Sequence, residues 1–296
     1  MNIVFYGNYA IKDVYPIYEA SGWKCDEYEA TGGKPIAKIR EFLKIMSADI
    51  VYIVSGCDVQ DTFAYRIAMT LGKKIVVHWI GTDVLHIREN YYKNPRKINA
   101  NCENYAVSPW LVEELREIGI LAKELPIVPS DIRCRCTELP MEHKVLTYLP
   151  SHRADFYNFE LTKHLAAALP QVTFYVVGND GSEDESRLPN IEYLGWLDRD
   201  QMRAAIDNST ILLRYPEHDG LPRMLIETLA AGREVVFKYK YPYVNTPRSD
   251  KFEDVLQSLK NIISKKPALN YEAEKYVEDN FSMAKMLERY KTYGLI

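Results

Sequence analysis

Short apolar runs alternate with amphipathic segments along almost the whole chain, and this alternation limits the possible folds more than any other feature. The run ADIVYIVSG (residues 48–56) is apolar at nearly every position, as is typical of a central parallel strand that is buried on both faces. A helical segment over 59–71 ends at Gly72, and a second buried run, KKIVVHWIGTD, follows over 73–83. Strands that alternate with helices in this way indicate a parallel α/β sheet.

The alternation occurs twice, and residues 128–143, with their prolines and mixed charges, interrupt it as a linker. Before the linker we expect strands at 2–7, 24–30, 48–56, 73–83, 104–109 and 122–127, and helices at 10–21, 35–46, 59–71 and 109–118. After it we expect strands at 144–150, 173–180, 191–196, 211–213 and 235–237, and helices at 156–169, 198–207, 222–231, 250–265 and 271–293. The predicted fold class is α/β, with two tandem Rossmann-like doubly wound domains and an interdomain cleft.

The length of 296 residues suits two domains of about 140–150 residues each. We place the N-terminal domain at 1–135 and the C-terminal domain at 136–280. The last helix, about 280–296, is expected to cross back and brace the two halves.

Composition excludes several classes of protein. The net charge of −4 argues against a general nucleic-acid binder, which needs a basic surface. The chain begins without the basic and apolar regions of a signal peptide, and no run of 18 apolar residues occurs. Five scattered cysteines are typical of reduced thiols. We therefore expect a cytoplasmic protein, with peripheral contact at the inner membrane face as an open alternative.

Several common catalytic motifs are missing from the sequence. Gly7 stands alone after the first strand, without the G-x-G-x-x-G of a dinucleotide site, and neither a P-loop nor a G-x-S-x-G elbow occurs. Asp198 and Asp200 have the D-x-D spacing of some metal sites, but Asp198 begins a helix and is better explained as its N-cap. Cys134 and Cys136 are poorly spaced for zinc. We expect no metal.

The stretch 211–237 carries the strongest functional signal. The apolar residues 211–213 predict a buried strand, the polar turn 214–220 follows, and a helix then runs from Pro222 to Gly232 before a second strand. The turn places Arg214, His218 and Asp219 at the carboxyl edge of a parallel sheet, where doubly wound folds bind ligands. The exposed start of the helix favours phosphate.

The segment DGLPRMLIE, from Asp219 to Glu227, followed by TLAAG, resembles the acid-x7-acid signature of the retaining, family 4-like glycosyltransferases of the GT-B fold. Asp219 stands where the family has a longer Glu. HWIGTD (78–83) resembles the family's His-Gly-Ser/Thr-Asp segment, with Ile80 at the histidine position. Weaker matches follow in the expected order at 106–109, 126–131, 177–178 and 281–282.

The resemblance implies a retaining, metal-independent glycosyltransferase (hexosyltransferase-type, EC 2.4). It would move a sugar from a nucleotide-diphosphate sugar, a UDP- or GDP-sugar, to an acceptor hydroxyl without any further cofactor. A glycan, a lipid-linked acceptor, a small molecule and a modified nucleic-acid base all remain open as acceptors. The basic, tyrosine-bearing segment 86–97 suggests either contact with a membrane or an anionic acceptor, or simply a solvated surface.

The expected site residues fall into three groups. The catalytic group contains Asp219, Arg214, His78 and Asp83. The donor-binding group contains Arg153, Gly220, Leu221, Pro222, Arg223, Glu227, His218 and Gly178. The acceptor-side group contains Gly7, Asn8 and Thr82.

The chemistry of these side chains suits a nucleotide sugar. Glu227 is an acceptor-only group for ribose hydroxyls, and Asp219 would bind hydroxyls of the transferred sugar. Arg214 and Arg153 would hold the diphosphate and stabilise the charge that develops on it as it leaves.

Each of these roles has an alternative explanation. Asp219 could merely cap the following helix, and His78 could be a core histidine. At the level of the whole chain, a non-catalytic nucleotide-sugar-binding or partner subunit remains open, because the family's histidine is missing and the first acid is shortened. An epimerase on the same fold is a third hypothesis.

Overall fold

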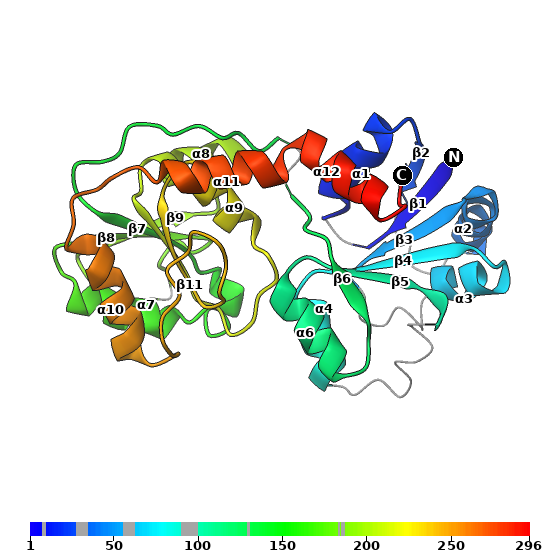
Figure 1. Cartoon of the computed structure of the whole chain (residues 1–296). Helices are drawn as coiled ribbons and strands as arrows, with labels where there is room; N and C mark the ends of the chain where they lie inside the picture. The colour runs from blue at the N-terminus through cyan, green and yellow to red at the C-terminus, as the bar shows by residue number, and fades with distance from the viewer. Residues whose placement is uncertain are drawn as a thin grey trace. The chain divides into compact units, whose positions relative to one another are not determined.

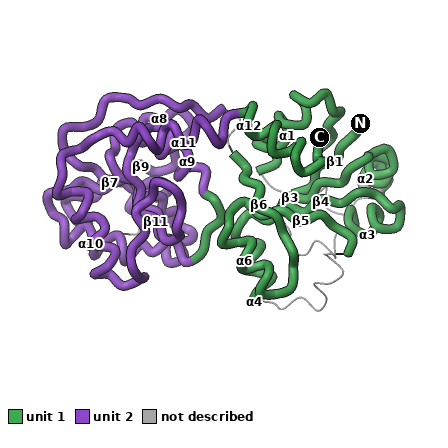
Figure 2. The backbone as a smooth tube through the Cα atoms, in the orientation of Figure 1, with its two compact units in different colours: residues 1–130, 218–221, 283–296 green, residues 131–217, 222–282 purple. Residues whose placement is uncertain are grey.

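A computed structural model describes residues 1–7, 10–27, 35–55, 63–89, 100–128, 131–182, 184 and 187–296 (Figure 1). The chain divides into two compact units, coloured in Figure 2. Unit 1 contains residues 1–130, 218–221 and 283–296, and unit 2 contains 131–217 and 222–282. Among the described residues, no helix is both long and apolar enough to cross a membrane.

Unit 1 is built on a six-stranded sheet in the order β2-β1-β3-β4-β5-β6, and every paired strand is parallel to its neighbour. Its strands are β1 (Asn2–Tyr6), β2 (Lys24–Glu27), β3 (Ile50–Val54), β4 (Lys74–Trp79), β5 (Glu103–Ala106) and β6 (Ala122–Glu124). Its helices are α1 (Ile11–Ala20), α2 (Pro35–Ser47), α3 (Phe63–Thr70), α4 (Thr82–Glu89), α6 (Pro109–Glu117) and α12 (Met283–Thr292). All five residues of β3 are buried, as its continuous apolar run predicts.

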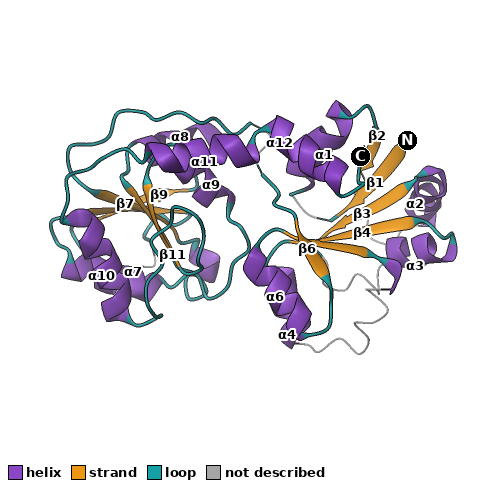
Figure 3. Cartoon of the chain, viewed as in Figure 1, coloured by secondary structure: helices purple, strands orange, loops and turns teal. Residues whose placement is uncertain are grey.

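Unit 2 contains a five-stranded parallel sheet in the order β11-β10-β7-β8-β9. Its strands are β7 (Lys144–Tyr148), β8 (Thr173–Val177), β9 (Ile191–Gly195), β10 (Ile211–Arg214) and β11 (Glu234–Phe237). Its helices are η2 (Ser151–Arg153), α7 (Phe159–Ala168), α8 (Arg199–Asp207), α9 (Arg223–Ala230), α10 (Phe252–Ile263) and α11 (Tyr271–Phe281). Helices α7 and α10 lie together on one face of this sheet, whereas α8, α9 and α11 lie together on the other (Figure 3).

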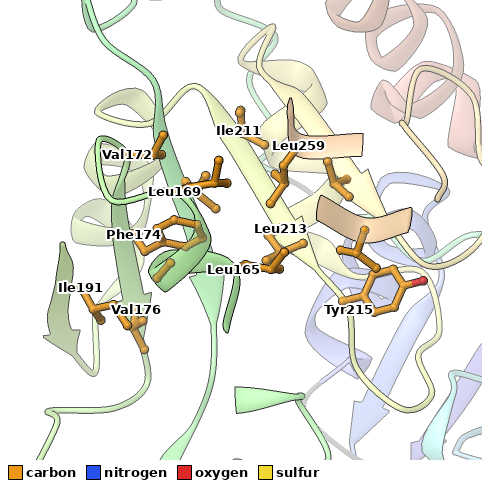
Figure 4. Packing of buried hydrophobic residues seen from close by; sticks show 14 of the residues in the cluster. Leu165, Leu169, Val172, Phe174, Val176, Ile191, Ile211, Leu213, Tyr215 and Leu259 are labelled. Carbon is orange, nitrogen blue, oxygen red and sulfur yellow. The ribbon is translucent and has the colours of Figure 1, made fainter. Parts of the chain in front are cut away.

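The core of unit 2 lies between its sheet and the pair α7 and α10 (Figure 4). Leu165 of α7 and Leu259 of α10 meet Phe174 of β8 and Ile211 and Leu213 of β10, and all five side chains are almost completely buried. This core fixes the strands whose carboxyl ends carry the predicted donor-binding residues. The prediction of two doubly wound parallel sheets is confirmed.

The C-terminal helical region differs from the prediction. The sequence predicts one helix over 271–293, but Ser282 adopts an extended conformation (φ −62°, ψ 153°) and separates α11 from α12. Helix α12 belongs to unit 1, where the Tyr290 ring meets Tyr18 edge-on at 5.7 Å between ring centres. The break lets the aromatic side chains of 271–293 enter two separate cores, which one continuous amphipathic pattern does not reveal.

Candidate functional site

The strand order of unit 2 reverses between β7 and β10, because β8 and β9 follow β7 on one side and β10 and β11 lie on the other. In open parallel sheets, ligands bind outside the carboxyl ends of the strands at this reversal. Three predicted site residues lie at this edge, the catalytic Arg214 and the donor-binding Arg153 and Gly178: Arg214 is the last residue of β10, Arg153 ends η2 after β7, and Gly178 follows β8. The sheet topology therefore brings residues from distant parts of the sequence to one edge.

Aromatic rings surround both guanidinium groups at this edge. The Cζ atom of Arg214 lies 5.4 Å from the ring centre of Tyr148 and 4.9 Å from that of Tyr157. Arg153 Cζ lies 4.0 Å from the ring centre of Phe156 and 5.8 Å from that of Tyr157. A cation over an aromatic face is stabilised by the ring quadrupole. Tyr157 thus borders two cationic groups, an arrangement that suits an anion with more than one charge.

Helix α9 begins beside the end of β10, and Pro222 is its N-cap residue, without any side-chain cap. Asp219 is therefore not the N-cap residue of this helix. Glu227, one turn into α9, is mostly buried and accepts a hydrogen bond from Arg223 Nε at 3.1 Å. Arg223 also contacts Asp131 at 3.2 Å. Arg223 therefore orients the carboxylate of Glu227.

Asp131 is a contact point for several basic side chains of unit 2. Arg199 and Arg203 of α8 form ion pairs with it, as Arg223 of α9 does. The sequence suggested only that 131 ends a family-like passage before the C-terminal domain. In the structure, its carboxylate ties the first residues of unit 2 to the helices that border the candidate site.

Trp196, which the sequence did not single out, lies at the same edge together with His152, a possible phosphate or sugar contact from the sequence. Trp196 directly follows β9, is 64% exposed and stacks on the His152 ring with 6.2 Å between ring centres. Gly178 has a φ of +86°, which favours glycine, and a Cβ atom there would be in tight contact with the Tyr148 ring (3.1 Å) and with Pro150 (3.2 Å). The sequence placed Trp196 inside the predicted strand 191–196, so it gave no signal that this ring is exposed at the edge of the sheet.

The predicted donor-binding residues His218, Gly220 and Leu221 and the predicted catalytic residue Asp219 belong to unit 1. We call these four residues the Asp219 loop. His218 and Leu221 are buried, whereas Asp219 is partly exposed. Gly220 lies against the carbonyl oxygen of Ile80, and a Cβ atom on Gly220 would come within 1.9 Å of that oxygen. Glycine at position 220 is therefore required by this backbone contact.

The predicted catalytic role of His78 does not fit its position. The side chain is fully buried in β4, in the interior of the sheet. Its Nδ1 atom lies 2.7 Å from the Tyr52 hydroxyl, and its Nε2 atom lies 2.6 Å from the Leu125 carbonyl oxygen. Because that carbonyl only accepts, Nε2 carries the proton and Nδ1 accepts from Tyr52. His78 is a core histidine, and we leave it out of the proposed site.

The burial of His78 predicts a pH dependence of stability. Burial lowers its pKa from 6.5 to about 4, so the unfolded chain binds this proton first as the pH falls. The free energy of unfolding is therefore highest above pH 6.5 and falls on acidification, by about 2 kcal/mol between pH 7.5 and pH 5, because of His78. Urea unfolding measures the free energy of unfolding at both pH values. The difference between the two values should be smaller for His78→Gln than for wild type. His86→Gln, which changes an exposed histidine, should keep the wild-type difference; equal differences for all three proteins would contradict the prediction.

Asp83, which the sequence places in the catalytic group, makes local hydrogen bonds to the backbone. The side chain is buried in the first turn of α4, and its Oδ1 atom accepts hydrogen bonds from the backbone N–H groups of Ile80, Gly81 and Val84 at 2.8–3.0 Å. The predicted catalytic carboxylate therefore shapes the turn between β4 and α4. Thr82, the first residue of α4, is only partly buried.

Gly7 follows β1 at the strand reversal of unit 1, between β1 and β3. Its φ is +138°, and a Cβ atom there would lie 2.0 Å from the carbonyl oxygen of Val54. Glycine thus allows the ends of β1 and β3 to approach each other closely. Asn8, the third predicted acceptor-side residue, lies outside the described residues.

The interpretation of the D-x-D spacing is confirmed. Asp198 is the N-cap of α8 and accepts a hydrogen bond from the Gln201 backbone, while the Gln201 side chain bonds back to the Asp198 N–H. This reciprocal pair is a capping box. Within the described parts of the chain, no cluster of three or more His, Cys, Asp or Glu side chains could hold a metal ion.

No protein-family model and no curated protein sequence matches the chain. Solved structures do match. Sucrose-phosphate synthase from Thermosynechococcus elongatus has a TM-score of 0.74 at 10% identity, over 99% of this chain and 98% of that chain. Trehalose-6-phosphate synthase from E. coli, bound with UDP-2-fluoro glucose, has a TM-score of 0.64 at 9% identity, with 99% and 98% covered.

S. aureus TarM in complex with Fondaparinux, alpha-GlcNAc-glycerol and UDP has a TM-score of 0.60 at 13% identity, over 82% of this chain. This chain spans only 55% of the TarM chain. At such low identities the likeness establishes the fold alone. The fold is GT-B, as the resemblance in the sequence implies.

Proposed function

We propose that this protein is a glycosyltransferase of the EC 2.4 class, which transfers a hexose from a nucleotide-diphosphate sugar to an acceptor hydroxyl. The observation that carries the proposal is the pair Arg214 and Arg153, which border Tyr157 at the strand reversal of unit 2, beside the start of α9. Solved structures of the same fold contain UDP or UDP-2-fluoro glucose, which supports a UDP-sugar as the donor, with a GDP-sugar as the second choice.

The residues of unit 2 would divide the recognition of the donor. The two guanidinium groups bind the diphosphate by charge-assisted hydrogen bonds, and the positive end of α9 adds to the attraction. Glu227, which Arg223 holds in place, accepts hydrogen bonds from the ribose hydroxyls. As the bond between sugar and diphosphate breaks, negative charge grows on the departing phosphate, and Arg214 stabilises it in the transition state.

The acceptor hydroxyl would attack the sugar on the face from which the diphosphate departs, so that the configuration at the sugar carbon is retained. No metal is required in this scheme, because the arginine side chains neutralise the leaving group. We assign the nucleotide to residues 136–280 and the acceptor to residues 1–135. The acceptors that we consider are a glycan, a lipid-linked molecule and a small metabolite, with a modified nucleic-acid base as the least supported.

A panel of nucleotide sugars tests the donor site by thermal shift, since a ligand that binds only the folded state raises the apparent stability. Glu227→Ala should weaken binding of the best donor about 10-fold to 100-fold, because a hydrogen bond to a charged acceptor contributes about 1.5–3 kcal/mol. Glu253→Ala, which removes an exposed carboxylate of α10, is the control. Binding that is equal in Glu227→Ala and wild type would contradict the donor-site assignment.

The same panel separates the other hypotheses. Release of free nucleotide in the presence of an acceptor supports the transferase, and an interconverted sugar identifies an epimerase. Binding of the donor without turnover by any acceptor identifies a binding subunit. The burial of His78 and the presence of Ile80 at the family's histidine position favour this binding subunit as the second candidate.

We also propose a peripheral membrane contact, and the structure suggests a surface for it on α2. Ile39, Leu43 and Met46 recur at helical spacing and are between 48% and 60% exposed, although they are apolar. Arg40 and Lys44 accompany this stripe, and the Glu41 side chain is buried. Apolar side chains beside basic ones suit a bilayer with anionic lipids. Of the segment 86–97, for which the sequence suggested this contact, residues 86–89 end α4 and residues 90–97 lie outside the described residues.

Sedimentation with vesicles tests this surface. Binding should require anionic lipid, and Leu43→Asp should reduce it about tenfold, because it puts a negative charge in the apolar stripe. Leu121→Asp, at an exposed leucine outside α2, should bind like wild type. Equal binding to neutral vesicles, or no effect of Leu43→Asp, would contradict the proposed surface.

A further inference from the structure

We infer that Trp110 and Glu114 of α6 are positioning residues, which fix the backbone of the Asp219 loop so that the Asp219 carboxylate meets the transferred sugar. This inference rests on the proposed function, because it needs a nucleotide sugar to bind, and on the role that the sequence predicts for Asp219, contact with hydroxyls of the transferred sugar. It adds two residues that the sequence did not associate with the site. All the contacts that carry it lie within unit 1.

Helix α6 presents both side chains to the loop. Positions 110 and 114 are four residues apart, so they lie on one face of the helix. The indole Nε1–H of Trp110 donates a hydrogen bond of 2.8 Å to the backbone carbonyl oxygen of Asp219. Glu114 Oε2 lies 2.8 Å from Nε2 of the buried His218. Two consecutive loop residues are thus attached to one helical face, one through its backbone and one through its side chain.

Helix α4 supports the attachment. Arg88 of α4 lies 3.3 Å from the same Glu114 oxygen, and Glu114 is only 14% exposed. A mostly buried carboxylate with two nitrogen partners has little freedom to rotate. The position of the His218 ring is therefore set by α4 and α6 together.

The other side of the loop is fixed by backbone contact. A Cβ atom on Gly220 would approach Ile80 O to 1.9 Å, and one on Gly81 would approach the Gly220 nitrogen to 2.6 Å. The 80–84 turn is itself rigid, because the Asp83 carboxylate accepts three of its backbone N–H groups. Asp219 therefore stands between an attached His218 and a closely packed Gly220.

This arrangement explains how an aspartate can serve in place of glutamate. The Asp219 side chain has one methylene fewer, so it has less reach and fewer rotatable bonds with which to correct a displaced backbone. A functional carboxylate must be held within about 0.5 Å of its working position. Fixing the main chain of residue 219 supplies that accuracy, and we assign this task to Trp110 and Glu114.

Two variants test the inference without removing the carboxylate. Trp110→Phe keeps an aromatic ring but removes the N–H donor, and Glu114→Gln keeps the shape but removes the charge. In the ligand-free full chain, amide hydrogen exchange over 218–221 should accelerate about tenfold in both variants. Calorimetry should show affinity for UDP-glucose falling about tenfold, the loss expected for one well-placed hydrogen bond. Affinity for UDP, which lacks the sugar, should stay unchanged.

Matched controls and separate outcomes make the test decisive. Glu113→Gln changes the exposed neighbour on α6, and Trp23→Phe changes another tryptophan of unit 1; both should behave like wild type. Unchanged exchange over 218–221 in Trp110→Phe and Glu114→Gln overturns the inference, and so does an equal loss of affinity for UDP and UDP-glucose. Wild-type protein that binds no member of the nucleotide-sugar panel overturns the proposed function instead, and the exchange data then still show whether α6 fixes the loop.

Discussion

Replacing Arg233 with leucine should lower the free energy of unfolding by about 3–5 kcal/mol, because it leaves several buried acceptors without their donor. The Arg233 side chain is fully buried at the start of β11. Its guanidinium group donates to the backbone carbonyl oxygens of residues 137, 138, 207 and 231 and to the hydroxyl of Thr137, at 2.6–3.4 Å. The nearest carboxylate oxygen, of Asp207, is 3.9 Å away. Burial lowers the pKa of Arg233, but its high ordinary value keeps the group charged.

The measurement is urea unfolding at neutral pH, with the loss read from the midpoint and the slope. Arg135→Leu is the control, because it removes an exposed arginine from the nearby linker and should change stability by less than about 0.5 kcal/mol. Arg233→Lys should recover only part of the stability, since an ammonium group cannot reach acceptors spread around a planar fork. A loss below about 1 kcal/mol for Arg233→Leu would mean that the backbone carbonyls find other donors.

The contacts of Arg233 could not be predicted from the sequence. The chain places a charged residue between Gly232 and Glu234, which suggests a solvated turn. Instead, its guanidinium group joins residues 137 and 138 of the predicted linker to the end of α8, through partners that lie 26 to 96 residues away. No local pattern encodes such a contact. The same reason explains why His78, with partners 26 and 47 residues away, was predicted to be catalytic.

Features with a local cause were predicted well. The buried strands follow from continuous apolar runs, and the Asp198 N-cap follows from an acid placed just before an amphipathic helix. The sequence predicts that the helix after β10 begins at Pro222, and α9 begins one residue later, at Arg223. The attachment of the Asp219 loop to α6 was not predicted, because Trp110 is 109 residues from its acceptor and nothing in the sequence near Trp110 indicates a partner.

The largest functional effect is expected at Arg214. Arg214→Ala should weaken binding of UDP about 100-fold and slow transfer from the donor by a further factor of about 10 or more, because removing one preorganised charge at a leaving group typically costs about 3–4 kcal/mol in the transition state. The side chain is buried at the end of β10, beside the rings of Tyr148 and Tyr157, whose centres are 5.3 Å apart. Its position is thus fixed before any ligand arrives, and no ordering cost opposes binding.

Lys144→Met provides a matched control for the loss of a cation beside an aromatic ring. Lys144 lies 5.4 Å from the ring centre of Tyr175, but it begins β7, at the amino edge of the same sheet. Its loss should leave affinity for UDP unchanged. Arg214→Lys should retain more affinity than Arg214→Ala, since it keeps the charge but not the planar fork. If Arg214→Ala and Lys144→Met bind UDP equally well while both unfold as wild type does, the diphosphate does not lie at the carboxyl edge of this sheet, and the assignment of Arg153 and Glu227 to the donor fails with it.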